Sequence, residues 1–138
     1  MSKETRISIA MAVCNGERFV REQLESFSRQ TRLPDELIVS DDASTDDSIE
    51  IVRSFAATAP FTVRVLANQK NLGCSKNFER AIQACTGDLI FLSDWDDVWL
   101  PNKIAVMERA FRQWPSAGVV ISCRQYVDEN LAPMKRSE

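Results

Sequence analysis

The chain has 138 residues, of which 44% are hydrophobic and 27% charged, with a formal net charge of −3 and no histidine. This length suits one domain with a buried core, and the acidic balance argues against binding along a nucleic-acid backbone. Without histidine, serine–histidine and cysteine–histidine hydrolase mechanisms and His-ligated metal centres are excluded.

The cysteines and the hydropathy pattern indicate a cellular compartment. Four widely spaced cysteines form no CxxC pair: Cys14, Cys74, Cys85 and Cys123. We expect them to be buried, reduced thiols of a cytoplasmic protein, with the inner face of the membrane as a second location. We expect no transmembrane segment, because no apolar run approaches the roughly 18 residues that a spanning helix needs. The N-terminal residues lack a signal-peptide layout.

Apolar strands alternate with amphipathic helices along the chain. The patterns predict strands at 7–13, 36–42, 61–68, 88–94 and 117–127, and helices at 16–31, 44–59, 74–85 and from Pro101 onward. Ser44 or Thr45 is expected to cap the second of these helices, and Trp114 to pack in the core. The alternation implies parallel strands with right-handed crossovers, and thus a single α/β domain over 1–130 followed by a frayed tail at 131–138.

Seven of the ten aspartates lie in two short windows, 41–47 and 94–97, each where a predicted strand ends. Ligands of open α/β sheets bind outside the carboxyl ends of the strands. Asp46 and Asp47 are explained by the start of a helix, and Asp41 and Asp42 remain open between a turn role and a ligand role. The 94–97 window lies too far before the helix predicted from Pro101 for its aspartates to cap that helix. Clustered carboxylates become favourable around a divalent cation, so this window predicts metal-assisted binding of a phosphorylated ligand.

Two further features have two possible interpretations each, one structural and one in ligand binding. The segment "NQKNLGCSKN" at 68–77 is either a surface loop or a phosphate site that uses backbone amides and Lys76. Trp95, which stands between acidic residues, either packs or faces the ligand.

Three segments carry a family resemblance: "ISIAMAVCNGERF", the acidic strand end "VSDDASTDDS", and "NLGCSKNFERAIQACTGDLIFLSDWDDVWLPNKI". In this order and spacing, from about residue 6 to 130, they resemble the nucleotide-binding half of family 2 glycosyltransferases, most closely rhamnosyltransferase-like enzymes of bacterial polysaccharide assembly. The resemblance implies a GT-A (Rossmann-like) three-layer sandwich. It also implies Mn²⁺ or Mg²⁺ as cofactor, a nucleotide-diphosphate sugar as donor, and a saccharide or lipid-linked saccharide as acceptor.

The resemblance also implies residue roles. Asp42 would contact the nucleotide base with Asp41 beside it, Asp96 would bind the metal, and Asp94 would lie at the metal and the donor sugar or ribose. Asp97 would support that loop. The remaining donor-binding positions lie after the first strand and before the third helix: Cys14, Asn15, Glu17, Asn71, Gly73 and Lys76.

The chain departs from the family in two ways. Cys14 stands where the family often has a base-stacking aromatic residue, and the chain ends after the predicted fifth strand, before the acceptor half and its catalytic base. We therefore expect a donor-binding portion that transfers sugar poorly alone and can dimerise through the open edge of the fifth strand. The alternatives are an inert nucleotide-sugar-binding module, a sugar-phosphate nucleotidyltransferase, and a signalling receiver domain. The nucleotidyltransferase is disfavoured by the single glycine in "AVCNGERF", and the receiver domain by the lack of a lysine in "VVISCRQYV".

Overall fold

The computed structural model describes residues 4–134 and alternates strands with helices in the predicted order. The elements are β1 (Ile7–Val13), α1 (Val20–Ser28), β2 (Glu36–Asp41), α2 (Ser48–Ala56), β3 (Thr62–Ala67), α3 (Cys74–Ala84), β4 (Leu89–Ser93) and α4 (Lys103–Gln113).

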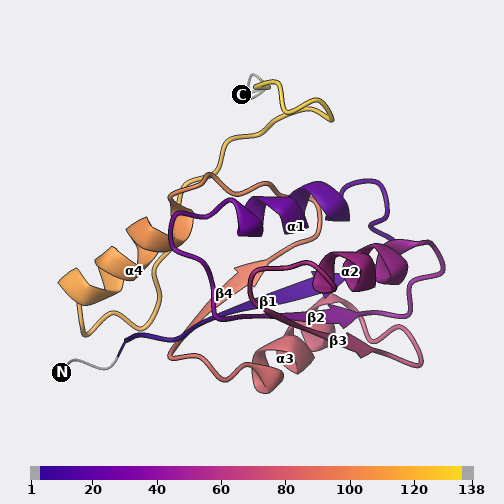
Figure 1. Cartoon of the computed structure of the whole chain (residues 1–138), viewed down its shortest axis with the longest axis horizontal. Coiled ribbons are helices and arrows are strands. Elements are labelled where there is room, and N and C mark those ends of the chain that lie inside the picture. The colour runs from indigo at the N-terminus through magenta and orange to yellow at the C-terminus, as the bar shows by residue number, and fades with distance from the viewer. Residues whose placement is uncertain (1–3, 135–138) are drawn as a thin grey trace. The chain divides into compact units, whose positions relative to one another are not determined.

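The four strands form one parallel sheet in the order β3-β2-β1-β4. All seven residues of β1 and all six of β2 are buried, as expected for central strands covered on both faces. Helices α1 and α2 cover one face of the sheet and α3 covers the other, which gives three layers (Figure 1). The predicted α/β sandwich with a parallel sheet is confirmed.

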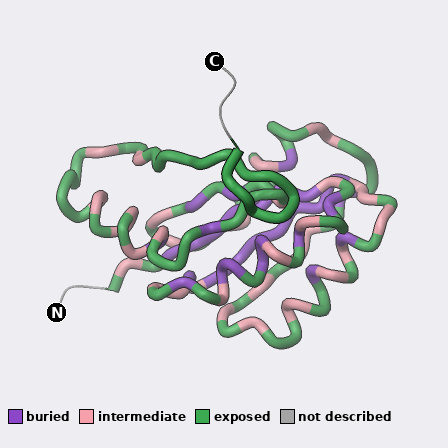
Figure 2. Tube along the Cα trace, turned by 90° about the horizontal axis from the view of Figure 1, so that it is seen from above, coloured by how far each residue is buried: buried purple, intermediate pink, exposed green. Residues whose placement is uncertain are grey.

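The core follows the alternation of side chains along the strands. Ala10 of β1 and Ile38 of β2 pack with Ala81 of α3 on one face. Ile9 and Met11 point to the opposite face and are fully buried. Figure 2 shows that the buried positions concentrate along these central strands.

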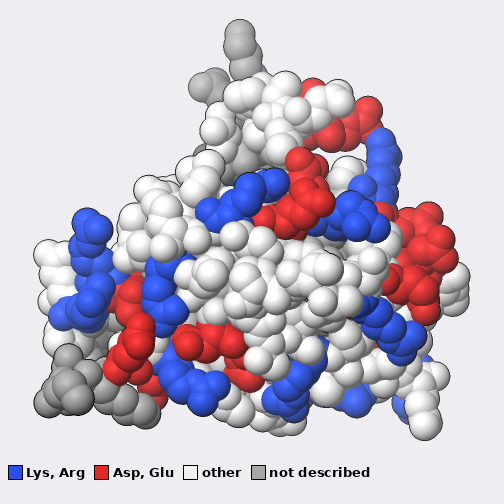
Figure 3. All heavy atoms as spheres, in the orientation of Figure 1, with Lys and Arg blue, Asp and Glu red and all other residues white. Residues whose placement is uncertain are grey.

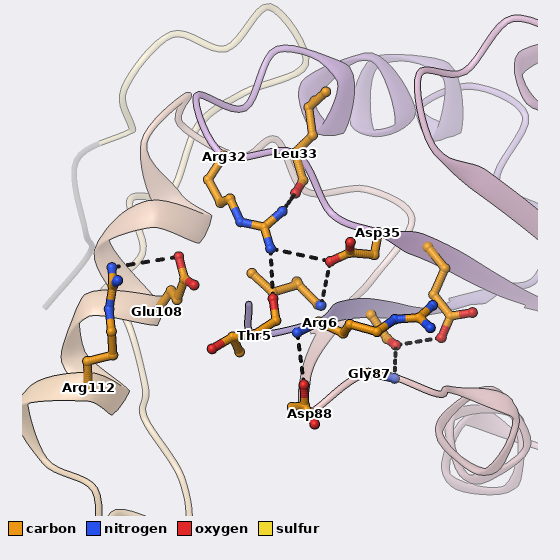
Figure 4. Close-up of polar contacts among 12 residues, drawn as sticks. Thr5, Arg6, Arg32, Leu33, Asp35, Gly87, Asp88, Glu108 and Arg112 are labelled. Atoms are coloured by element: carbon orange, nitrogen blue, oxygen red, sulfur yellow. Dashed lines mark hydrogen bonds and ion pairs between the residues drawn. The ribbon is translucent and has the colours of Figure 1, made fainter. Parts of the chain in front are cut away.

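Polar contacts brace the amino-terminal ends of the strands, opposite the acidic windows. Arg32 donates to the Thr5 carbonyl (2.8 Å) and to Asp35 Oδ2 (3.3 Å), which also accepts from the backbone N–H of Ile7 (2.8 Å) (Figure 4). Buried Glu36 accepts from Ser8 Oγ at 2.6 Å. These contacts fix where β1 and β2 begin.

The chain divides into two compact units, at residues up to Val106 and from Met107 onward, and α4 crosses the boundary. The expected domain over 1–130 stays a prediction, and residues 135–138 of the expected frayed tail lie outside the described part. Within residues 4–134, no helix has the length and apolar character needed to cross a membrane.

The predicted fifth strand at 117–127 is wrong. Among the described residues this segment makes one isolated bridge, between Val127 and Pro133. Val119 and Ile121 are 75% and 88% exposed. An apolar, β-branched run becomes a strand only where a neighbouring strand pairs with its backbone, and this segment has no such neighbour in the described chain. The expected dimer edge therefore lacks its strand, and dimerisation stays a prediction.

Two side-chain expectations are also wrong. Trp114 is 56% exposed, because it lies just beyond the last turn of α4 rather than on its buried stripe. Neither Ser44 nor Thr45 caps α2, which begins at Ser48 after an Asp47 whose side chain makes no capping bond. Ser44 Oγ instead accepts from the N–H of Asn15.

Candidate functional site

Loops from all four strand ends meet at the carboxyl edge of the sheet. The parallel strands point to the same side of the molecule (Figure 1). The loop after β2 contacts the loop after β1 and the loop after β3, and Trp95 from the loop after β4 lies against Gly16 from the loop after β1. The structure therefore brings the two acidic windows to the same edge, as the sequence predicts.

Asp42 is the hub of a hydrogen-bond network that holds the turn before α3 in place. Its Oδ1 accepts from the N–H of Leu72 (2.7 Å) and from Asn68 Nδ2 (2.9 Å), and its Oδ2 accepts from the N–H of Gly73 (2.9 Å). Burial alone acts to raise the pKa of Asp42, but these hydrogen bonds outweigh it and hold the pKa below its usual value. Both carboxylate oxygens are thus engaged within the chain, and the predicted contact of Asp42 with a base stays a prediction.

Asp41 differs from its neighbour in having a free oxygen. The residue is 2% exposed, and its Oδ2 accepts from the N–H of Ser44 at 3.1 Å. Its Oδ1 is buried and contacts no donor within the described residues. A buried carboxylate oxygen without a partner is costly in free energy, so this oxygen is a candidate acceptor for a hydrogen bond from a ligand.

Two asparagines, neither of them among the predicted site residues, complete this network. Asn68 also donates to Asn77 Oδ1 (3.1 Å), and Asn77 Nδ2 donates to the carbonyls of Ser40 (2.8 Å) and Val13 (3.3 Å). Asn77 therefore links the ends of β1 and β2 to α3. A signal was present, because Asn77 lies four residues before buried Ala81 on the same helical stripe.

The turn after β1 and the loop before α2 brace each other. Asn15, in the left-handed region at φ 50°, accepts from the N–H of Thr45 at 2.8 Å. Glu17 accepts from the N–H of Asp47, and the Glu17 N–H donates to Asp46, both at 3.0 Å. Asn15 and Glu17 thus hold the rim of the site, and their predicted contacts with base and ribose stay predictions.

Cys14 lies between the first and second strand ends. Its Sγ accepts from Asn71 Nδ2 at 3.5 Å and donates to the Asp42 carbonyl at 3.7 Å. Burial, followed by the charges of Asp42 and Asp41, raises the pKa of the thiol, so it stays protonated at neutral pH. All four cysteines are free as predicted, but Cys74 and Cys123 are exposed rather than buried.

The turn before α3 has a backbone conformation that favours glycine. Gly73 has φ 86°, which favours glycine, and stands at the N-cap of α3. Asn71 accepts from the Gly73 N–H at 3.1 Å. Lys76 is exposed in the first turn of α3, and its predicted phosphate contact stays a prediction.

The 94–97 window forms the loop that leaves β4. Asp94 Oδ1 accepts from the N–H of Trp95 at 3.2 Å. Partial burial, followed by the negative charges of Asp96 and Asp97, raises the pKa of Asp94. Among residues 4–134, no group of three or more His, Cys, Asp or Glu is arranged to hold a metal. The oxygen donors of Asp94 and Asp96 fit Mn²⁺ or Mg²⁺ in a site where a ligand's phosphates and water supply the other bonds.

The tryptophans near this loop have different surroundings. Trp99 is 5% exposed and packs on Phe27 (4.8 Å between ring centroids) and Phe91 (5.8 Å). Trp95 packs on Gly16 and Phe19. Figure 3 shows acidic and basic side chains interspersed over the visible face.

The comparisons with known proteins agree with this arrangement. A family model for glycosyl transferase family 2 matches residues 8–138. The dTDP-rhamnosyl transferase RfbG of Shigella flexneri is 36% identical over 98 residues, which are 68% of this chain and 34% of RfbG.

Two solved structures are similar in fold at 25% identity. S. aureus TarS 1–349 in complex with UDP-GlcNAc has a TM-score of 0.67 over 78% of this chain and 31% of TarS 1–349. Glucosyl-3-phosphoglycerate synthase from Mycobacterium tuberculosis, in complex with Mn²⁺, UDP and glucosyl-3-phosphoglycerate, has a TM-score of 0.58 over 75% of this chain and 38% of the synthase.

The chain thus spans about a third of the length of RfbG and of TarS 1–349. The predicted GT-A fold is confirmed by the parallel sheet and by these structures. Because the family model covers nearly the whole chain, the chain belongs to glycosyl transferase family 2.

Proposed function

We propose that this chain is the donor-binding part of an enzyme of bacterial surface-glycan assembly. The enzyme transfers a sugar from a nucleotide-diphosphate sugar to a saccharide or lipid-linked saccharide. Family membership supports the reaction type, and the similarity to RfbG supports a rhamnosyl donor. The four free cysteines suit the reducing cytoplasm, with the inner face of the membrane as the place where a lipid-linked acceptor is met.

The observation that carries the proposal is the buried, unpartnered Oδ1 of Asp41, at the same edge of the sheet as the acidic loop. A carboxylate oxygen in this position accepts an N–H of a nucleobase and thereby regains its missing hydrogen bond. Asp42 then acts indirectly, by holding the 71–73 turn at the rim of the same site. The assignment moves the base contact from Asp42 to its neighbour.

Asp96 and Asp94 are the residues that would hold the divalent cation. Mn²⁺ in the similar synthase supports this metal for the present chain. A bound cation offsets the charge that develops on the departing nucleoside diphosphate. Cys14, Asn15, Glu17, Asn71, Gly73 and Lys76 complete the proposed donor site around the loops after β1 and β3.

The catalytic base is expected outside this chain, in the acceptor-binding part of a longer protein. The second candidate is an inert nucleotide-sugar-binding module, which the same binding residues would serve. A transfer assay separates the two, because an enzyme in its full length releases nucleoside diphosphate in the presence of acceptor and an inert module does not.

A thermal-shift panel tests the donor site directly. UDP, dTDP, GDP and their sugars are each added with Mn²⁺, with Mg²⁺ or with EDTA. We expect the nucleotides of one base to raise the Tm, and only when the divalent cation is present. The Asp41→Asn substitution should reduce this rise in Tm. Asp47→Asn is the matched control, because Asp47 is exposed at the start of α2. A wild-type chain that none of these nucleotides stabilises would contradict the proposal.

A further inference from the structure

The loop from Asp94 to Asn102, between β4 and α4, is held on both sides by polar side chains of α1 and its C-terminal flank. Gln23 lies 2.6 Å from Ser93 Oγ, immediately before the acidic window. After the window, Ser26 Oγ accepts from the N–H of Trp99 at 3.2 Å. Further on, Gln30 donates to the Leu100 carbonyl at 2.8 Å. Each of these residues of the first helical segment is buried, so the two ends of the loop are firmly placed.

Trp95 is the residue within the acidic window that the chain anchors by packing. Its indole lies flat over Gly16, where an added Cβ would come within 2.8 Å of Trp95 Cδ2. The ring also stacks on Phe19, with centroids 6.2 Å apart and an angle of 26° between the planes. No larger residue fits at Gly16 unless the indole moves, so the contact links the end of β1 to the residue between Asp94 and Asp96.

We propose that Trp95 is a positioning residue for the cation site, and that Gly16 provides the space in which the indole packs. The packed indole fixes the backbone between Asp94 and Asp96, so that the loop carrying the two carboxylates is already ordered before a cation arrives. Such preorganisation lowers the free-energy cost of binding, because the loop does not have to be ordered at that moment. The inference rests on the proposed function, in which these two residues hold the metal.

Trp95 as a stacking platform for the base is the competing role. The two roles predict that different affinities are lost when Trp95 is replaced. A platform contributes to nucleotide binding whether or not a cation is present, whereas a positioning residue contributes to the binding of the cation itself.

A double-mutant cycle with Mn²⁺ as the probe tests the proposal. The proteins are wild type, Gly16→Ala, Trp95→Ala, the double variant and Trp95→Phe, with Gly118→Ala as control because an added Cβ there meets nothing within 4 Å. Electron paramagnetic resonance measures the affinity for Mn²⁺ alone and with UDP, and calorimetry measures UDP binding in EDTA. Circular dichroism confirms that each variant is folded.

We expect Trp95→Ala and Gly16→Ala each to weaken Mn²⁺ binding by about 10-fold, the lower end of the losses seen when supporting residues of metal sites are removed. The double variant should be no weaker than Trp95→Ala, because Gly16 acts through the indole. Trp95→Phe should restore most of the affinity, and Gly118→Ala should change nothing.

Four results would overturn the inference. Trp95→Ala with wild-type Mn²⁺ affinity would remove the positioning role. A loss of UDP binding in EDTA, with Mn²⁺ binding intact, would show a stacking role instead. A Gly16→Ala effect of the same size in both backgrounds would show that Gly16 acts without Trp95. If Asp96→Asn binds Mn²⁺ as tightly as wild type does, the proposed metal site fails and the inference fails with it.

Discussion

Replacement of Asp42 by asparagine should destabilise the protein, because the carboxylate joins three parts of the chain. It accepts three hydrogen bonds, from Leu72, Gly73 and Asn68. Asparagine is uncharged, and it has one acceptor oxygen where the carboxylate has two. Whichever way the amide is oriented, it cannot accept all three bonds: either Leu72 and Asn68 lose their bonds to residue 42, or Gly73 keeps only its bond to Asn71.

The size of the effect follows from the bonds that are lost. Hydrogen bonds to a charged group contribute about 1.5–3 kcal/mol each, and neutral ones about 0.5–1.5 kcal/mol. Losing one charged bond and weakening the others gives an expected loss of about 3 kcal/mol in the free energy of unfolding. Such a loss is a large fraction of the roughly 5–15 kcal/mol that stabilises a typical domain.

Urea denaturation at several pH values measures this loss. The pKa of Asp42 is lowered in the folded state, so its contribution is complete at neutral pH. It disappears as the pH falls below about 4, the ordinary value, towards the lower folded pKa. The difference between wild type and Asp42→Asn should shrink over that range. The exposed control Asp47→Asn should stay within about 0.5 kcal/mol of wild type. An Asp42→Asn variant as stable as this control, or a difference independent of pH, would refute the reasoning.

Three other predictions concern the same half of the molecule. Ala43 has φ 57°, so Ala43→Gly should relieve strain and raise stability by about 0.5 kcal/mol net of the entropy of glycine; a lower urea midpoint would contradict this. Glu36→Gln keeps the acceptor of Ser8 and Thr86 but loses the charge, and should cost about 1 kcal/mol, while an unchanged midpoint would oppose it. Because the pKa of its thiol is raised, Cys14 should react with iodoacetamide more slowly than exposed Cys74 does, and bound nucleotide should slow the reaction of Cys14 further. Mass spectrometry measures both rates, and equal rates for the two cysteines would contradict this prediction.

The sheet and the position of the site were predictable because local sequence and tertiary structure agree there. The strands β1 and β2 are short apolar runs, and each is buried on both faces. Parallel strands place their carboxyl ends at one edge, so the aspartates that follow β2 and β4 had to come to that edge. Gly73 is among the positions that the resemblance places before the third helix, and its positive φ explains why glycine stands there.

The other features depend on contacts that no local pattern contains. The run at 117–127 has strand composition, yet a strand needs a partner, and partnership is a property of the whole fold. The hydrogen bonds of Asn77 are not predicted by apolar periodicity, because that pattern does not include a polar residue on a buried helical stripe. Likewise, the residue pattern does not separate Asp41 from Asp42 and the family resemblance favours Asp42, whereas the structure shows that the oxygen without a partner belongs to Asp41.

The central claim is that the acidic loop after β4 binds a nucleoside diphosphate through a divalent cation. Calorimetry of the best nucleoside diphosphate from the panel, with Mn²⁺ and then with EDTA, tests this claim in wild type and in Asp96→Asn. We predict that Mn²⁺ tightens binding to wild type by at least about 10-fold and has no such effect on Asp96→Asn, as expected when a metal ligand is removed. An Asp96→Asn variant that keeps the full effect of Mn²⁺ would contradict the account.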